Sequence, residues 1–350
     1  MASAPDHAEL TPVREAHRFD EAALATYLRG RLPGCNGALR VQQFEGGQSN
    51  PTYRIEAGGH AYVLRKKPPG KLLPSAHQVE REYRVISALQ GSDVPVPRTR
   101  LLCEDPDVIG TPFYLMDCVE GRLLTDARMP RLTRDERIAL YADFVRVLAA
   151  LHSLDPAAIG LADFGRPGNY YVRQIARWSQ QYTASQTEDI PAMKALMDWL
   201  PAHVPESDET RVVHGDYRVG NCIVHPSEPR VIAVLDWELS TLGHPLGDLA
   251  YFCQGYHGEA VPGETLVGVD FAATGIPDEA AVLARYCRLT GRERIDDWSF
   301  YLVFVMFRSA AIVQGVYKRG LDGNAASQRA QEYGALVRRR ADQALELVQR

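Results

Sequence analysis

Residues 211–225 read RVVHGDYRVGNCIVH, and residues 231–238 read VIAVLDWE. Three apolar runs alternate here with two polar turns, the second of which is the segment PSEP at 226–229. Apolar runs of this length that are bounded by turn residues predict short strands. We therefore expect two strands of a hairpin, entered through the loop around Asp216 and left at Asp236.

The spacing of three polar residues in this stretch indicates a reaction type. Asp216 is followed five positions later by Asn221, and Asp236 ends the next strand. This order matches the base, second metal ligand and first metal ligand of kinase active sites. Each residue alone has a plainer explanation, as a turn cap, a turn asparagine or a solvated strand end. Together they predict phosphoryl transfer, with Asp216 as catalytic base and Asn221 and Asp236 on Mg²⁺.

Three neighbours of this motif receive lesser roles. Glu238 is a further oxygen ligand within reach of the metal, although a surface position explains it equally well. His214 is expected to shape the loop through backbone hydrogen bonds and not to transfer protons. Asp248 is expected to cap a helix and brace the loop.

A glycine-rich turn near the start of the chain is a candidate phosphate loop. The segment GGQSN at 46–50 precedes a strand, so backbone N–H groups near Gly47 could approach phosphates closely, and Ser49 and Asn50 add donors. Glycine pairs before strands are more often simple turns. The chain contains no Walker A sequence.

A basic residue at the end of the next strand is the candidate partner of the phosphates. Arg65 closes the apolar run 61–64, and Glu82 in the following helix is its expected counter-charge, with Glu80 as the alternative. Lys66 falls on the opposite face of the strand because strand side chains alternate. The plainer alternative is an exposed basic patch beside solvated glutamates.

The order of predicted elements indicates an α+β fold with two lobes. After a polar, partly disordered lead at residues 1–17, strands and one helix at 77–89 are expected to form an N-lobe over 18–116. Two of these strands, at 52–55 and 61–65, are expected to form a hairpin with its turn at Gly58 and Gly59. A polar connection at 117–121 leads to a C-lobe over 122–350, with helices near 138–152, 171–182, 190–202, 278–290, 296–319 and 325–348. Thr133 is the expected N-cap of the first of these helices. Strands followed by helices argue against a doubly wound sheet.

Composition narrows the classes of function. A net charge of -5 argues against nucleic-acid binding, and the longest apolar run, 300–307, is too short to span a membrane. The six cysteines are scattered without a CxxC pair, which favours reduced thiols in a cytoplasmic protein. No N-terminal signal for export is visible.

On these residues the chain resembles the aminoglycoside phosphotransferase family, which has a bilobal protein-kinase-like fold. The segments HGD at 214–216 and LDWE at 235–238, with Asn221, carry the resemblance, which covers roughly residues 40–320. Within this family, the chain is most similar to the kinase domain fused to certain acyl-CoA dehydrogenases. Four segments carry this similarity: GQSNPTY from residue 47, YVLRKKPPG from residue 62, REYRVI from residue 81 and GTPFY from residue 110. We expect this chain to be a stand-alone form of that domain.

The resemblance implies ATP and Mg²⁺ as cofactors and Asp216 as the base. It also implies that the backbone of a hinge, including Met116, Asp117 and Val119, meets the adenine. Arg65 departs from the family pattern, which has a phosphate-anchoring lysine at that place.

The phosphate acceptor is expected to be a small molecule with a hydroxyl group. Residues 301–350 contain more Arg and Lys than Asp and Glu, and Arg308, Lys318 and Arg319 suit a polycationic sugar poorly. The resemblance implies a hydroxyacyl-CoA or a hydroxy acid, whose anionic groups could meet these cations. The arginines could equally cover helix surfaces. The alternatives are an aminoglycoside or amino-alcohol kinase and a pseudokinase module that binds nucleotide without transfer.

Overall fold

The computed structural model describes residues 9–45, 50–68, 78–258, 263–321 and 332–349. The chain forms two compact units. The first comprises residues 1–125 and 220–240, and the second comprises 126–219 and 241–350. The following paragraphs treat each unit by itself.

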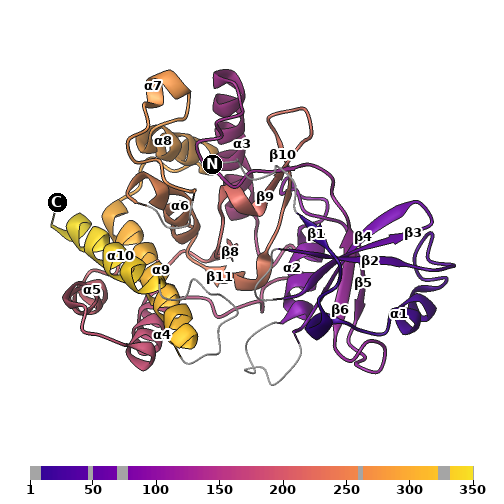
Figure 1. Ribbon diagram of the computed structural model, residues 1–350. Coiled ribbons are helices and arrows are strands. Elements are labelled where there is room, and N and C mark those ends of the chain that lie inside the picture. The colour runs from indigo at the N-terminus through magenta and orange to yellow at the C-terminus, as the bar shows by residue number, and fades with distance from the viewer. Residues whose placement is uncertain (1–8, 46–49, 69–77, 259–262, 322–331, 350) are drawn as a thin grey trace. The chain divides into compact units, whose positions relative to one another are not determined.

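The first unit is built on an antiparallel sheet with two helices (Figure 1). Its elements in chain order are β1 (Leu10–Thr11), η1 (Glu15–His17), α1 (Glu21–Leu28), β2 (Arg40–Phe44), β3 (Thr52–Ala57), β4 (His60–Lys66), α2 (Val79–Leu89), β5 (Thr99–Cys103), β6 (Phe113–Asp117), β7 (Arg122–Leu123), β9 (Cys222–Val224), β10 (Val231–Val234) and η3 (Trp237–Leu239). The six-stranded sheet has the order β1-β2-β3-β4-β6-β5, and every neighbouring pair is antiparallel.

Alternation along the central strands separates the two faces of this sheet. Tyr53, Ile55 and Leu64 are fully buried in one apolar cluster with Leu24 and Leu28 of α1. Arg65 comes next to Leu64 in β4, so it points to the other face. The predicted hairpin between β3 and β4 is present, and its turn residues Gly58 and Gly59 both have positive φ, which glycine adopts without strain.

The predicted hairpin after the Asp216 loop is confirmed. Strand β9 pairs with β10, and β9 also pairs with β7 in a small three-stranded sheet. Gly121 directly precedes β7, the edge strand of this sheet. A Cβ at Gly121 would approach the Ile223 side chain and the Val224 carbonyl oxygen to 2.5 Å. The first apolar run of the motif does not join this sheet. It forms β8 (Arg211–Val213), which pairs with β11 (Thr241–Gly243).

Two predicted boundaries were wrong. The described part of the lead, from residue 9 to 17, contains β1 and η1 instead of disordered chain, because β1 pairs with β2. Residues 220–240, which we had placed in the second lobe, belong to the first unit, since β9 pairs with β7 and the Val234 N–H donates to the Pro95 carbonyl at 2.8 Å.

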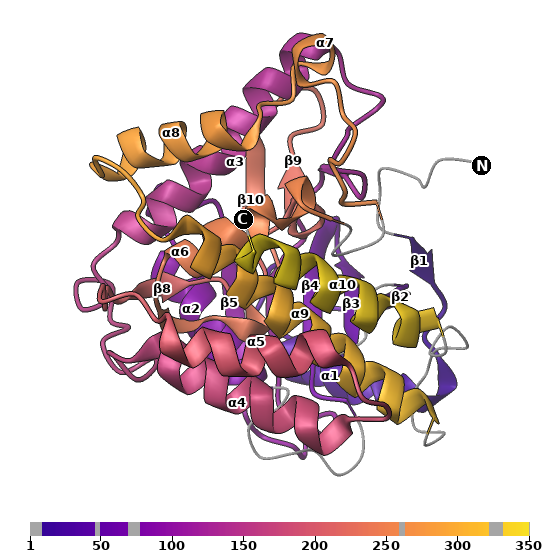
Figure 2. The same ribbon diagram turned by 90° about the vertical axis from the view of Figure 1, so that its left-hand side faces the viewer.

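The second unit is mostly helical (Figure 2). Besides β8 and β11, its elements are α3 (Arg134–Ser153), α4 (Tyr170–Ser185), α5 (Pro191–Ala202), α6 (Leu246–Cys253), η4 (Gln254–Tyr256), α7 (Phe271–Thr274), α8 (Glu279–Thr290), α9 (Trp298–Leu321) and α10 (Glu332–Val348), while η2 (Val219–Asn221) contains the boundary between the units. The predicted N-cap Thr133 is confirmed, and it forms a capping box with Glu136. Residues 325–331 of the last predicted helix lie outside the described residues.

Helix α9 forms the core of this unit. The helix has 24 residues and is long and apolar enough to cross a membrane by length and composition. However, 83% of its most apolar 18-residue segment is buried inside the protein, where α9 packs against α4, α5, α6 and α10. Such burial is typical of the central helix of a globular unit.

Candidate active site

An ion-pair network on the α2 side of the first unit contains three predicted site residues. The Arg65 Nε lies 3.0 Å from the Glu82 Oε2, so the predicted partner of Arg65 is confirmed. The Arg65 Nη2 donates to the Asp236 Oδ1 at 3.4 Å and lies 4.0 Å from Glu238. The alternative partner, Glu80, pairs with Lys67 instead.

Two further residues hold the Glu82 carboxylate, which is only 1% exposed. The Tyr114 hydroxyl donates to Oε2 at 3.1 Å, and the Asn50 amide donates to Oε1 at 2.6 Å. Tyr114 is brought here because it pairs with Arg65 across strands β6 and β4. Asn50 was predicted as a phosphate donor. Its fully buried amide points instead at Glu82, and Gly47 and Ser49 of the same loop lie outside the described residues.

The charges around Arg65 keep it a permanent cation. Burial alone would lower the pKa of its guanidinium, but the carboxylates of Glu82, Asp236 and Glu238 outweigh burial, and the pKa is raised. Three carboxylates therefore lie within ion-pair distance of this one guanidinium.

The two predicted metal ligands lie at adjacent ends of the β9–β10 hairpin. Asn221 precedes β9 and Asp236 follows β10, and the Leu235 N–H donates to the Asn221 carbonyl at 2.8 Å. Asp236 has a positive φ of 65°, a backbone conformation that is uncommon for residues other than glycine, although Asp and Asn adopt it more readily than most.

These donors are of the kind that Mg²⁺ prefers. Asp236 is partly exposed, with 36% of its side chain accessible, and it offers carboxylate oxygens, while Asn221 offers an amide oxygen. Among the described residues, no group of three or more His, Cys, Asp or Glu side chains forms a self-contained metal cage. Magnesium sites that use one or two protein ligands together with substrate phosphates fit this donor set.

The predicted hinge has part of its backbone already engaged. The Asp117 N–H donates to the Arg98 carbonyl at 2.8 Å, and the Cys118 N–H donates to the Ala61 carbonyl at 3.1 Å. The Asp117 carboxylate binds Arg100 with two hydrogen bonds of 2.6 and 2.8 Å. An adenine contact at this hinge would therefore use other backbone groups of Met116 to Val119.

Lys66 lies on the opposite face of β4 from Arg65, as the strand pattern predicted. Its Nζ lies 6.0 Å from the ring centroids of Phe19 and Tyr53, and the residue is 4% exposed. Burial lowers the pKa of this amine. Of the two candidate phosphate anchors, Arg65 is the one on the face that carries the carboxylate network.

In the second unit, Asp248 fixes the loop that carries Asp216. Its Oδ2 accepts from the His214 N–H at 2.6 Å, and its Oδ1 accepts from the Gly215 N–H at 2.8 Å. The predicted brace is thus confirmed, although Asp248 lies in the first turn of α6 and Pro245 is the N-cap. His214 accepts from the Asp216 N–H at 3.2 Å, in the loop-shaping role that we expected.

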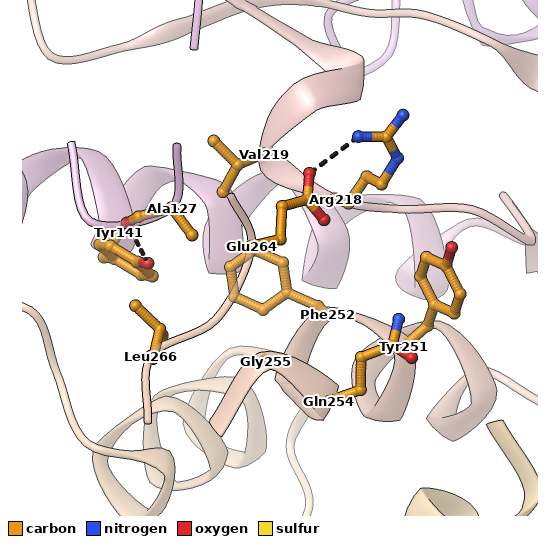
Figure 3. Close-up of a pocket in the computed structure, with 10 residues that line it drawn as sticks. All are labelled: Ala127, Tyr141, Arg218, Val219, Tyr251, Phe252, Gln254, Gly255, Glu264 and Leu266. Atoms are coloured by element: carbon orange, nitrogen blue, oxygen red, sulfur yellow. Dashed lines mark hydrogen bonds and ion pairs between the residues drawn. The ribbon is translucent and has the colours of Figure 1, made fainter. Parts of the chain in front are cut away.

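Two side chains that the sequence did not single out, Tyr251 and Arg218, contact Asp216, and Glu264 holds Arg218. Figure 3 shows these three side chains at the wall of a small pocket. The pKa of Tyr251 is raised by burial, by the charge of Asp216 and by a hydrogen bond with that carboxylate. The Arg218 Nε lies 3.5 Å from the Asp216 Oδ2, and its Nη1 donates to the Glu264 Oε1 at 2.8 Å. Arg218 therefore shares its charge between the candidate base and Glu264.

The pocket behind Arg218 is too small for a substrate. Its volume is about 20 Å³, which is the space of about one water molecule, and Tyr251, Gln254 and Glu264 help to line it. The Gln254 Oε1 has no hydrogen-bond partner in the described part of the chain. A single water molecule in the pocket could donate a hydrogen bond to this oxygen. The pocket is too small to bind an acceptor molecule.

Comparison with known proteins agrees with this geometry. The family model described as "Phosphotransferase enzyme family" matches residues 40–293. The chain belongs to this phosphotransferase family. The resemblance inferred from the sequence is therefore confirmed, as is the α+β fold.

Related proteins divide into two groups. A Ralstonia eutropha protein named as a candidate aminoglycoside phosphotransferase is 50% identical, with a TM-score of 0.87 over 95% of this chain and 99% of its own. Spectinomycin phosphotransferase APH(9)-Ia, solved with ADP and spectinomycin, is 14% identical with a TM-score of 0.61, over 95% of this chain and 99% of its own, and shows the fold alone. Acyl-CoA dehydrogenase family member 11 of Gallus gallus is 45% identical over all of this chain, which spans 46% of that relative.

Proposed function

We propose that this phosphotransferase transfers the γ-phosphoryl group of ATP to a hydroxyl group of a small molecule, with Asp216 as the catalytic base. The main support is that the chain holds Asp216 through Asp248, Tyr251 and Arg218, in a loop whose spacing to Asn221 matches kinases. In this reaction the acceptor hydroxyl gives its proton to Asp216. Its oxygen bonds to the γ-phosphorus while the bond to the β,γ-bridging oxygen breaks and ADP leaves.

Asn221 and Asp236 would hold Mg²⁺. Bound there, the ion would neutralise negative charge on the phosphates. Arg65 would add a fixed positive charge, oriented by Glu82 on a buried face of the sheet. Asp216 and Asn221 are five residues apart in the chain, the same separation as between the base and the metal-binding asparagine of kinases.

For the acceptor we propose a hydroxyacyl-CoA or a hydroxy acid. The support is the similarity to a kinase-like part of an acyl-CoA dehydrogenase family member, together with buried and exposed arginines of the second unit near the Asp216 loop. An aminoglycoside or amino-alcohol acceptor is the alternative, because structural relatives with the same fold include a spectinomycin kinase. A pseudokinase without transfer is disfavoured by the presence of Asp216, Asn221 and Asp236.

The test is ATP-dependent phosphorylation across a panel of hydroxyacyl-CoAs, hydroxy acids, amino alcohols and aminoglycosides. We expect a phosphorylated product with an acyl acceptor, and we expect Asp216→Asn to reduce its rate about 10²- to 10⁴-fold. Asp198→Asn, an exposed aspartate on α5, is the matched control and should retain full activity.

The product is identified by mass spectrometry and ³¹P NMR. Phosphorylation of amino alcohols or aminoglycosides alone would replace the acyl acceptor with the alternative. ATP binding without any product across the whole panel would favour the pseudokinase.

A further inference from the structure

A buried arginine of the core helix α9 contacts the loop of the candidate base. Arg308 is 7% exposed, and its Nη2 donates to the Gly215 carbonyl at 2.8 Å. Its guanidinium carbon lies 5.6 Å from the ring centroid of Trp178 on α4 and 5.8 Å from that of Tyr251 on α6. Its described partners are thus one carbonyl and two aromatic rings, none of which carries a full negative charge.

A second arginine approaches the same tryptophan. The guanidinium carbon of Arg177 lies 5.2 Å from the Trp178 ring, and Arg177 itself is exposed. Within the described ranges of the chain, no carboxylate lies within ion-pair distance of either Arg177 or Arg308. Two cations therefore lie near one aromatic ring, and the described part of the chain places no carboxylate within ion-pair distance of them.

Two partly buried arginines among the candidate site residues have carboxylate partners. Arg65 has the carboxylates of Glu82 and Asp236, and Arg218 has those of Glu264 and Asp216. A buried cation without a counter-charge is costly, because it loses hydration that cation–π contacts replace only in part. A cation retained in such a place is well suited to bind an anion that arrives with a ligand.

Tyr251 links this pair to the candidate base. Its ring faces Arg308, and its hydroxyl is hydrogen-bonded with Asp216. Gly215, whose carbonyl binds Arg308, directly precedes Asp216. An anion held by Arg308 would therefore belong to a molecule that also reaches Asp216.

We propose that Arg308 and Arg177, on the Trp178 ring, form the subsite that binds an anionic group of the acceptor, a carboxylate or a phosphate. This inference rests on the proposed function and deepens it by assigning the residues that select an anionic acceptor. Arg308 would supply the buried contact to the anion, and its guanidinium is already held by the Gly215 carbonyl. Arg177 would supply the solvent-exposed contact. Lys318 and Arg319, which the sequence grouped with Arg308, lie further along α9 near its end.

The test compares Arg308→Gln with Arg288→Gln, which makes the same change at an exposed position of α8 in the same unit. The probes are a hydroxy acid, its neutral methyl ester, and its CoA thioester. For Arg308→Gln we expect the KM of the anionic probe to rise about 10- to 100-fold, as for loss of a charge-assisted hydrogen bond, with kcat changed less than about threefold. The ester should be unaffected, and Arg308→Lys should recover part of the affinity.

Comparison of the three probes distinguishes a carboxylate of the acceptor from a phosphate of CoA. A KM effect on the free acid identifies a carboxylate, and an effect confined to the CoA thioester identifies a CoA phosphate; either supports the subsite. An equal loss of kcat for acid, ester and thioester would show that Arg308 only braces the loop, and would overturn the proposal.

Calorimetric binding gives a readout that does not depend on turnover. Binding of the free acid or of CoA that weakens in Arg308→Gln, but not in Arg288→Gln, supports the subsite even if no phosphorylated product forms. If Arg308→Gln does not fold, the exposed Arg177→Gln should weaken the same binding. Binding of both probes that is unchanged in Arg177→Gln, or absent from the native protein, would remove the subsite.

Discussion

The Nε of Arg65 lies 3.0 Å from the Glu82 carboxylate, and the same guanidinium reaches Asp236 at 3.4 Å. One cation thus joins strand β4, helix α2 and the end of strand β10. Because Asp236 is the proposed metal ligand and Arg65 the proposed phosphate anchor, the arrangement would couple the positions of these two sites. Disturbing one carboxylate should therefore affect both folding and nucleotide binding.

We expect Glu82→Gln to destabilise the protein by about 3–5 kcal/mol, because it removes the charge that compensates the buried Arg65. Chemical denaturation measures this change, and ATP affinity should fall with it. Glu80→Gln on the same helix is the control and should cost about 0–1 kcal/mol, since its pair with Lys67 is partly exposed. Equal stabilities of the two variants would contradict the compensating role of Glu82.

Asp236→Ala should lose at least about tenfold in Mg²⁺-dependent ATP affinity, because a charged ligand of the proposed metal site disappears. Titration calorimetry with Mg²⁺ and with EDTA separates the metal-dependent part of the binding. Asp107→Ala, at an exposed loop position of the same unit, should bind as the unmodified protein does. If Mg²⁺ strengthened ATP binding to Asp236→Ala as much as to the unmodified protein, Asp236 would not be a metal ligand.

Gly255→Ala should destabilise the second unit by about 1–3 kcal/mol. A Cβ at Gly255 would lie 2.4 Å from the Glu264 carbonyl oxygen, so the backbone of the residue that holds Arg218 must shift. We also expect a lower kcat, because Arg218 contacts Asp216. In Gly37→Ala a Cβ meets no atom within 4 Å, and stability should change little. Similar unfolding midpoints for the two variants would argue against the close packing at Gly255.

Stability should fall between pH 6.5 and about 4 because of His244. Burial lowers the pKa of this histidine to about 4, in an aromatic cluster that includes Tyr171 and Tyr301. The unfolded chain binds the proton first, so the contribution is complete above pH 6.5 and is lost as the pH falls to about 4. The full difference corresponds to about 3 kcal/mol.

Denaturation curves at several pH values measure this slope. His244→Phe keeps a ring in the cluster and should flatten the pH dependence in this range. His203→Gln, at an exposed position, should leave it unchanged. An unaltered slope in His244→Phe would assign the acid sensitivity to other groups.

Local patterns predicted most of the elements near the site. Alternating residues indicated β3 and β4, the glycine pair at 58–59 indicated their turn, and Thr133 marked the start of α3. The pairing of β8 was not predictable in the same way, because a short apolar run does not reveal whether β9 or β11 is its partner. The early segment from residue 9 was also misjudged, since its strand is two residues long and is stabilised only by pairing with β2.

The sequence by itself determined the family and the candidate site residues, because residue types at a short spacing, Asp216 to Asn221 and then Asp236, follow from the local chain. It also indicated that Glu82 would accompany Arg65. Only the tertiary structure decided that Glu264 holds Arg218 and that Arg308 binds the Gly215 carbonyl, 93 positions earlier in the chain. These two contacts depend on how helices that are distant in the sequence pack together. The hydrophobic periodicity of the sequence predicts helices and strands but not which buried polar groups meet in the core.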